Sequence, residues 1–152
     1  MTTIVVTETE IAYDSQVTTS NQRHRCAFEK VQARKGRIYA FAGDASLFEA
    51  CMGWYERGAK PKKAPKGDWH LAVVTARGMW WYTYESRHGV KVAAPLTLGS
   101  GADFAAGALE HGATAREAVA VAAKRDIYTG YEINVINIRE SLAAQKKGAA
   151  SG

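Results

Sequence analysis

The first residues of the chain are the first candidates for chemistry. The sequence begins Met1-Thr2-Thr3, and removal of Met1 would leave Thr2 with a free α-amine. Cytoplasmic processing commonly removes a first methionine when a small residue follows it. A threonine hydroxyl is a weak nucleophile alone, but a terminal α-amine titrates near ~7.7–8.0, so its neutral form can accept the hydroxyl proton. Small residues after Met1 are common, so this start alone does not distinguish an enzyme from other proteins.

Other polar residues stand where secondary structure begins or ends. Asp14 closes a strand pattern, and Lys30 is expected inside an apolar-flanked strand, where a solvated lysine is not the obvious choice. Gly43 stands at a strand-to-helix junction, where a backbone N–H can stabilise an oxyanion. The ordinary explanation of Asp14 and Lys30 is a structural ion pair.

Three further polar residues stand in the C-terminal half. Ser100 lies in a Gly-Ser-Gly turn between a strand and a helix, and Asp126 and Thr129 follow the last predicted helix. Taken singly, Ser100 can be a turn residue and Asp126 can cap a helix. The spacing of the three predicts only that they lie at the ends of regular elements.

The elements that position these residues can be read from apolar periodicity and turn residues. Strands are expected at Thr3–Thr7, Ile11–Asp14, Glu29–Ala33, Arg37–Gly43, Trp69–Thr75, Met79–Tyr84, Leu96–Leu98 and Glu132–Ile138. Helices are expected at Ala45–Arg57, at Ala102–Glu110 and from Thr114, which opens a capping box with Glu117, to about Arg125. Hairpins with helices inserted in groups, without regular βαβ alternation, predict an α+β fold with helices layered over antiparallel sheets.

Size and composition fit one domain. The chain has 152 residues, of which 47% are hydrophobic and 23% charged. We expect a folded domain over residues 1–138 and an Ala/Lys/Gly-rich tail over residues 139–152. No apolar run approaches the ~18 residues that span a bilayer, and no secretion signal is present, so we expect a cytoplasmic protein without membrane contact.

The charge and the metal-binding residue types exclude some classes of function. The net charge of +5 comes largely from Lys60–Lys66 and the pair Lys146-Lys147, where no aromatics are interleaved, so we expect solvated charge or partner contact and no nucleic-acid binding. Cys26 and Cys51 lack metal-ligand spacing, and the four histidines are scattered. We therefore expect no metal and no cofactor.

The order of the polar residues resembles that of the proteasome β-subunit family, and most closely the bacterial HslV peptidases. The resemblance covers about residues 2–138, and six short patterns occur in the family's order. They are Thr-Thr-Ile-Val at 2–5, Ala-x-Asp-x-Gln at 12–16, Lys-Val at 30–31, Phe-Ala-Gly at 41–43, Gly-Ser-Gly at 99–101 and an Asp-Ile-x-Thr-like pattern at 126–129. No single pattern is specific, but a chance match of the whole ordered set is improbable.

The resemblance implies a role for each polar residue. Thr2 would be the nucleophile and its α-amine the base, while Lys30, held by Asp14, would lower the pKa of the reacting groups through its charge. The N–H of Gly43 would stabilise the tetrahedral intermediate. The residues that would hold the terminal amine in a hydrogen-bond network are Ser100, Asp126 and Thr129.

The resemblance also implies an architecture and partners. The fold would be a four-layer αββα sandwich of the N-terminal-nucleophile hydrolases, and the copies would assemble into a homo-oligomeric ring or stacked rings that enclose peptide or unfolded-protein substrates. The segment Lys60–Asp68 is too short and proline-rich for the second long helix of the family. Because that helical layer contributes to docking of an ATP-dependent unfoldase, the sequence leaves this partner open.

Two other functions stay open at this point. If Met1 is retained, the amine of Thr2 is locked in a peptide bond, and the chain would be a catalytically silent ring-forming subunit. A basic binding module is the third reading, for which only the lysine-rich loop speaks. Retained Asp14, Lys30 and Ser100 favour the peptidase over the silent subunit, because an idle site has little physical reason to hold a lysine within a strand.

Overall fold

A computed structural model describes the fold of residues 2–151. A four-stranded antiparallel sheet has the strand order β10-β1-β2-β11. Its strands are β1 (Ile4–Val6), β2 (Glu10–Tyr13), β10 (Leu96–Leu98) and β11 (Asn134–Asn137). β1 and β2 are buried along most of their length, which fits the β-branched residues of this segment.

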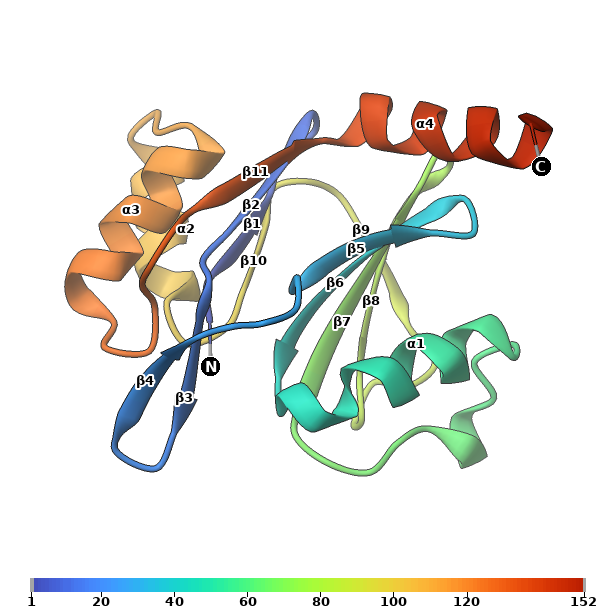
Figure 1. The fold of residues 1–152 in the computed structure, drawn as a ribbon, viewed down its shortest axis with the longest axis horizontal. Helices are drawn as coiled ribbons and strands as arrows, with labels where there is room; N and C mark the ends of the chain where they lie inside the picture. The colour runs from blue at the N-terminus through green and yellow to red at the C-terminus, as the bar shows by residue number, and fades with distance from the viewer. Residues whose placement is uncertain (1, 152) are drawn as a thin grey trace.

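A five-stranded antiparallel sheet has the order β5-β6-β7-β8-β9. Its strands are β5 (Val31–Arg34), β6 (Arg37–Gly43), β7 (Trp69–Thr75), β8 (Gly78–Thr83) and β9 (Val90–Val92). A separate hairpin of β3 (Gln16–Thr19) and β4 (Gln22–Arg25) extends from the edge of the molecule (Figure 1).

The helices lie outside the two sheets. They are α1 (Phe48–Glu56), α2 (Ala102–Glu110), α3 (Ala115–Arg125) and α4 (Ile138–Ser151), with short 3-10 turns at Ala45–Leu47 and Pro61–Lys63. α3 begins with the capping box predicted from the sequence, because Thr114 and Glu117 each accept a backbone N–H of the other residue.

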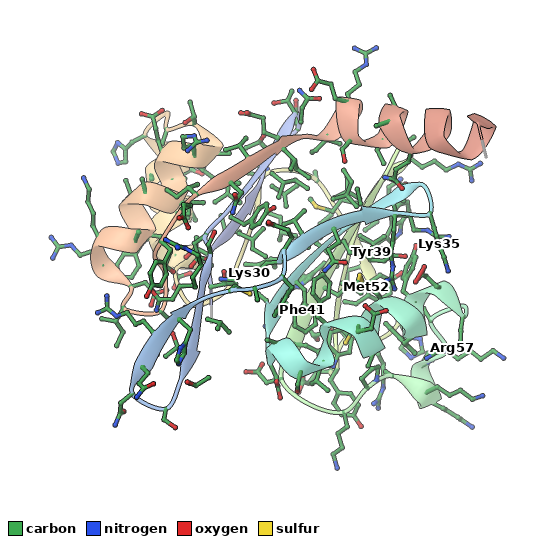
Figure 2. All side chains as sticks on the ribbon, viewed as in Figure 1. Lys30, Lys35, Tyr39, Phe41, Met52 and Arg57 are labelled. Carbon is green, nitrogen blue, oxygen red and sulfur yellow. The ribbon has the colours of Figure 1, made fainter. Side chains whose placement is uncertain are left out.

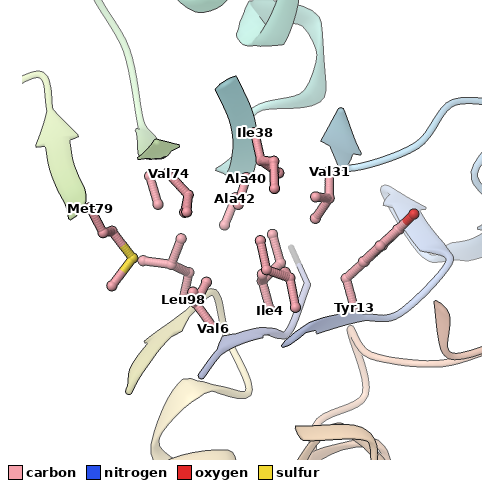
Figure 3. Close-up of a cluster of buried hydrophobic side chains, with 12 residues drawn as sticks. Ile4, Val6, Tyr13, Val31, Ile38, Ala40, Ala42, Val74, Met79 and Leu98 are labelled. Carbon is pink, nitrogen blue, oxygen red and sulfur yellow. The ribbon is translucent and has the colours of Figure 1, made fainter. Parts of the chain in front are cut away.

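Three apolar clusters hold four layers together. The cluster between the two sheets includes Ile4 and Val6 on one side and Ile38 and Val74 on the other (Figure 3). A second cluster of aromatic and sulfur-containing residues packs α1 on the outer face of the five-stranded sheet (Figure 2). A third, rich in alanine, packs α2 and α3 on the outer face of the four-stranded sheet. The layer order is therefore αββα, and the predicted α+β sandwich is confirmed.

Several elements differ from the sequence prediction. Lys30 was expected inside a strand but lies one residue before β5, and the β3–β4 hairpin was not among the expected strands. Every residue of β4 is exposed, so the alternation of buried and exposed positions that identifies a strand is missing. The loop after α1 forms only one 3-10 turn, as its prolines predicted.

The C-terminal segment is helical. α4 starts directly after β11, and its residues Ile138 and Leu142 pack against the cluster between the sheets. Gln145 receives a hydrogen bond from the N–H of Gly36 and donates one to the carbonyl of Arg37. The segment expected as a tail therefore covers one end of the five-stranded sheet (Figure 1). No helix within residues 2–151 combines the length and apolarity needed to cross a bilayer.

Candidate active site

The hydroxyl of Thr2 lies between a buried acid and a buried base. Lys30 Nζ donates to Thr2 Oγ1 (2.6 Å), to Asp14 Oδ1 (2.8 Å) and to the carbonyl oxygen of Gln16 (2.5 Å), and Thr2 Oγ1 donates to Asp14 Oδ1. An ammonium group has three N–H donors, and here each donor has one acceptor. Met1, whose removal the sequence predicts, lies outside the described residues.

Burial sets the electrostatics of this group. Lys30 is 6% exposed and Asp14 is fully buried. Desolvation lowers the pKa of Lys30, and the negative charge of Asp14 opposes that shift without cancelling it. The lysine donates to the Thr2 hydroxyl, and a donor that faces an oxygen favours the deprotonated form of that oxygen. The activation of Thr2 by this contact stays a prediction.

The carboxylate of Asp14 accepts hydrogen bonds from three backbone N–H groups. Its Oδ1 accepts the N–H of Thr3 (3.2 Å), and its Oδ2 accepts the N–H groups of Gln16 (3.2 Å) and Gly130 (3.0 Å). These bonds satisfy a charge that burial would otherwise make costly. They also join the N-terminal strand to the loop after α3, although more than 100 residues separate the two in sequence.

A second polar network lies behind the first. Ser100 Oγ and Thr129 Oγ1 both donate to Asp126 Oδ2 (2.6 Å each), and the hydroxyls of Thr3 and Thr129 are 2.7 Å apart. Ser100 Oγ also lies 3.4 Å from the carbonyl oxygen of Thr2. The three residues predicted to form one network are thus joined. Their role toward a free amine stays a prediction.

The turn that carries Ser100 approaches Thr2 closely. Gly99 has a φ of +96°, and a Cβ at this position would lie 2.0 Å from the carbonyl oxygen of Thr2. Only glycine fits such a contact in this backbone conformation. The glycine therefore explains how a turn between β10 and α2 can reach the residue proposed as nucleophile.

Gly43 lies at the rim of the same site. With Thr2 and Lys30 it lines a cavity of about 20 Å³, which is roughly the space of one water molecule. The apolar walls of this cavity are formed by Phe28, Phe41 and Ala45. Phe41 is labelled in Figure 2. The predicted donor and the predicted nucleophile thus face one space.

We expect Gly43→Ala to destabilise the fold at the site. The φ of Gly43 is +130°, and a Cβ there would lie 2.5 Å from the carbonyl oxygen of Asp68 and 2.7 Å from the Cα of Trp69. Strain and overpacking together predict a loss of about 2–6 kcal/mol in the free energy of unfolding, measured by urea denaturation.

The matched control is Gly36→Ala. Gly36 also has a positive φ, of +78°, but no heavy atom lies within 4 Å of its added Cβ. It should lose only about 1–2 kcal/mol. Equal losses in the two variants would show that the backbone around Gly43 can move aside.

Buried polar residues concentrate in this part of the described chain. Seven of the eight lie in the two networks, and they are Thr2, Thr3, Asp14, Gln16, Lys30, Asp126 and Thr129. The sequence alone predicts no role for Thr3 or Gln16. Gln16 Nε2 donates to the carbonyl of Ile127 (2.9 Å), so this side chain holds the loop after α3 against the site. Its only signal in the sequence was its place two residues after Asp14.

No described group of three or more His, Cys, Asp or Glu side chains in residues 2–151 is arranged to hold a metal ion. Cys51 is buried and Cys26 is half-buried, and both are free thiols.

Solved structures with a similar fold exist, although the sequence itself matches little. No protein-family model matches the sequence, and no curated protein matches it. Among solved structures, eukaryotic HslV from Trypanosoma brucei matches with a TM-score of 0.67 at 17% identity, over 90% of this chain and 97% of that chain.

A second solved protein, BPH from Thiobacillus denitrificans, matches with a TM-score of 0.65 at 16% identity, over 90% of this chain and 97% of that chain. Its complex with Epoxomicin matches with a TM-score of 0.66 at 16% identity, over 90% and 98%. These similarities extend over nearly the full length of each solved chain, and the layer order found here is αββα. The chain therefore has the fold of HslV and BPH.

Proposed function

We propose that the chain belongs to the proteasome β-subunit and HslV family and is a threonine peptidase that hydrolyses peptide bonds with Thr2 as nucleophile. The observation that carries the proposal is the position of Thr2 Oγ1, which is hydrogen-bonded to Lys30 Nζ and Asp14 beside a cavity that Gly43 also lines. A structural ion pair alone would not require a hydroxyl between its partners.

The first step is acylation of Thr2. Once the peptide bond before Thr2 is cleaved, its neutral α-amine accepts the hydroxyl proton while Oγ1 attacks the substrate carbonyl carbon. Lys30 stabilises the developing charge on Oγ1, and the N–H of Gly43 donates to the oxyanion. The intermediate then collapses: the C–N bond breaks, the leaving amine takes the proton from the α-amine, and an ester to Thr2 remains.

The second step is hydrolysis of the ester. The α-amine accepts a proton from water, the resulting hydroxide adds to the ester carbonyl carbon, and the C–O bond to Thr2 breaks. The proton returns to Oγ1, so Thr2 is regenerated and the product leaves as a carboxylic acid. Asp126, Ser100 and Thr129 hold the backbone of Thr2 during both steps through the contact of Ser100 with its carbonyl oxygen.

We propose that copies of the chain associate into a ring and that peptides or unfolded chains are the substrates. Native mass spectrometry of the purified protein tests the first point, because a ring gives a defined multiple of the subunit mass. A monomer at micromolar concentration would contradict self-association without contradicting the chemistry of Thr2.

The test of the chemistry is the intact mass before and after incubation with epoxomicin, which one of the similar structures contains. We expect the mass of the chain without Met1, followed by one adduct. Thr2→Ala should abolish the adduct. Thr7→Ala, which changes a hydroxyl that bonds only the backbone of Thr9 and Glu10 within its own turn, should keep it.

Three outcomes would overturn the proposal. The full mass with no adduct would make the chain a silent ring-forming subunit in this form. Loss of Met1 without an adduct, or an adduct that persists in Thr2→Ala, would remove Thr2 as the nucleophile.

A further inference from the structure

A second, larger cavity lies on the other side of Gly43. Its volume is about 230 Å³, against about 20 Å³ for the cavity that contains Thr2 and Lys30. A cavity of roughly 150 Å³ is large enough to bind benzene, whereas about 10–15 Å³ holds one water. The larger cavity therefore has room for an aromatic ring, and the smaller one does not.

The wall of the larger cavity is aromatic. His70 of β7 and Trp81 of β8 both line it, with ring centroids 5.7 Å apart and an interplanar angle of 14°. Trp81 Nε1 donates to His70 Nδ1 (3.3 Å), so the two rings hold each other in place. Leu98 and Ala102 add apolar surface beside the rings, and the polar lining residues are Asp68, Thr97 and Ser100. Aromatic side chains pack favourably against such fixed rings.

The larger cavity lies beside Thr2, although Thr2 itself does not line it. Gly99 and Ser100 line it, and Gly99 packs against the carbonyl oxygen of Thr2. Gly43, which faces Thr2 in the small cavity, forms part of both walls. A peptide whose carbonyl lies between Thr2 and Gly43 therefore has one neighbouring side chain near each cavity.

The chemistry of acyl transfer indicates which substrate residue lies near which cavity. The residue whose carbonyl is attacked becomes bonded to Thr2 Oγ1, so its side chain lies nearest the small cavity around Thr2 and Lys30. We place the residue that contributes the leaving amine on the far side of the broken bond, next to the second cavity that Gly43 lines. The space that opens there is the larger cavity.

We propose that the cavity lined by His70, Trp81 and Ala102 is a substrate subsite that binds an aromatic side chain on the residue contributing the leaving amine. This inference rests on the proposed peptidase function and adds a substrate class to it. The cavity gives the enzyme a preference on the product-amine side of the bond, set by residues of one chain.

The test uses two peptides that differ only in the residue after the scissile bond, Phe in one and Gly in the other. Mass spectrometry identifies the bond cut, and kcat/KM is measured for each peptide. We expect the Phe peptide to be cleaved roughly tenfold more efficiently. Trp81→Leu should lower the Phe-to-Gly ratio several-fold because it removes one ring of the wall.

Two more variants keep the test independent of folding. Trp80→Leu changes the neighbouring residue of β8, which packs on the opposite face of the sheet toward α1, and should leave the ratio unchanged. Ala102→Leu fills the cavity from α2 and should lower the ratio without changing the strands. Thermal unfolding of each variant checks that its fold is retained.

The outcomes separate this inference from the function on which it rests. Cleavage of neither peptide by the unchanged protein would contradict the peptidase function itself. Cleavage of both with equal efficiency, a ratio that neither Trp81→Leu nor Ala102→Leu alters, or an aromatic preference on the acyl side would overturn the subsite alone.

Discussion

Lys30→Met is expected to lower kcat for peptide cleavage by roughly a hundred- to a thousandfold, the effect of removing one donor that faces developing charge. Met matches the length of the lysine stem but cannot donate to Thr2 Oγ1 or compensate Asp14. The measurement is steady-state hydrolysis of a peptide at a temperature where circular dichroism shows a folded variant. Lys66→Met, at an exposed loop position, should keep the activity of the unchanged protein.

The pH dependence gives a second readout of the same residue. Burial lowers the pKa of Lys30 below its usual value of 10.5. If the protonated ammonium is the active form, kcat/KM falls as pH rises through that lowered pKa, so the alkaline limb begins below pH 10.5. Lys30→Arg keeps its proton at all accessible pH values, so any residual activity of that variant should lack the limb. An activity that rises through the same range would contradict the electrostatic role.

Asp14→Ala is expected to lower the free energy of unfolding by roughly 3–5 kcal/mol, the usual loss when one partner of a buried ion pair is removed. The variant leaves the ammonium of Lys30 without its carboxylate and three backbone N–H groups without their acceptor. Urea denaturation measures the loss. Asp103→Ala, an exposed carboxylate in the first turn of α2, should change stability by less than about 1 kcal/mol.

A double-mutant cycle shows whether the loss comes from the unpaired charge. Asp14→Ala combined with Lys30→Met removes both charges, so the double variant should be less destabilised than the sum of the two single variants by roughly 1–3 kcal/mol. Strict additivity would mean that the ion pair is weakly coupled. It would also mean that the backbone N–H groups of Thr3, Gln16 and Gly130 account for the stability that Asp14 provides.

The two variants should also separate stability from catalysis. Asp14 bonds five groups and anchors the loop after α3, whereas Lys30 donates only to the Thr2 hydroxyl, Asp14 and one carbonyl. Asp14→Asn keeps an oxygen acceptor for N–H donors and should therefore be more stable than Asp14→Ala. Its activity should still fall, because the lysine loses its counter-charge.

The sequence by itself determined the elements whose signals are local. The strand at Leu96–Leu98 has the predicted bounds, and the capping box at Thr114 starts α3 where predicted. β-branched runs and capping residues act over a few neighbours, so their effect can be read without the rest of the chain. The β3–β4 hairpin was missed because its outer strand buries no face and has no periodic pattern.

The candidate site residues could be named from their order along the chain, but their contacts could not. Only the tertiary structure shows that the ammonium of Lys30 donates to Thr2, Asp14 and Gln16. It also shows that the N–H of Gly130, 116 residues further along the chain, donates to Asp14. The roles of Thr3 and Gln16 in the buried networks likewise appear only in the fold.

The larger cavity is the clearest case of a feature that only the fold decided. Its wall combines β6, β7, β8 and the turn into α2, and no local pattern marks those residues as neighbours. A short sequence pattern records the preference of a segment for a helix, a strand or a turn. A cavity depends on how two sheets pack, and that packing is set by the apolar clusters that join segments distant in sequence.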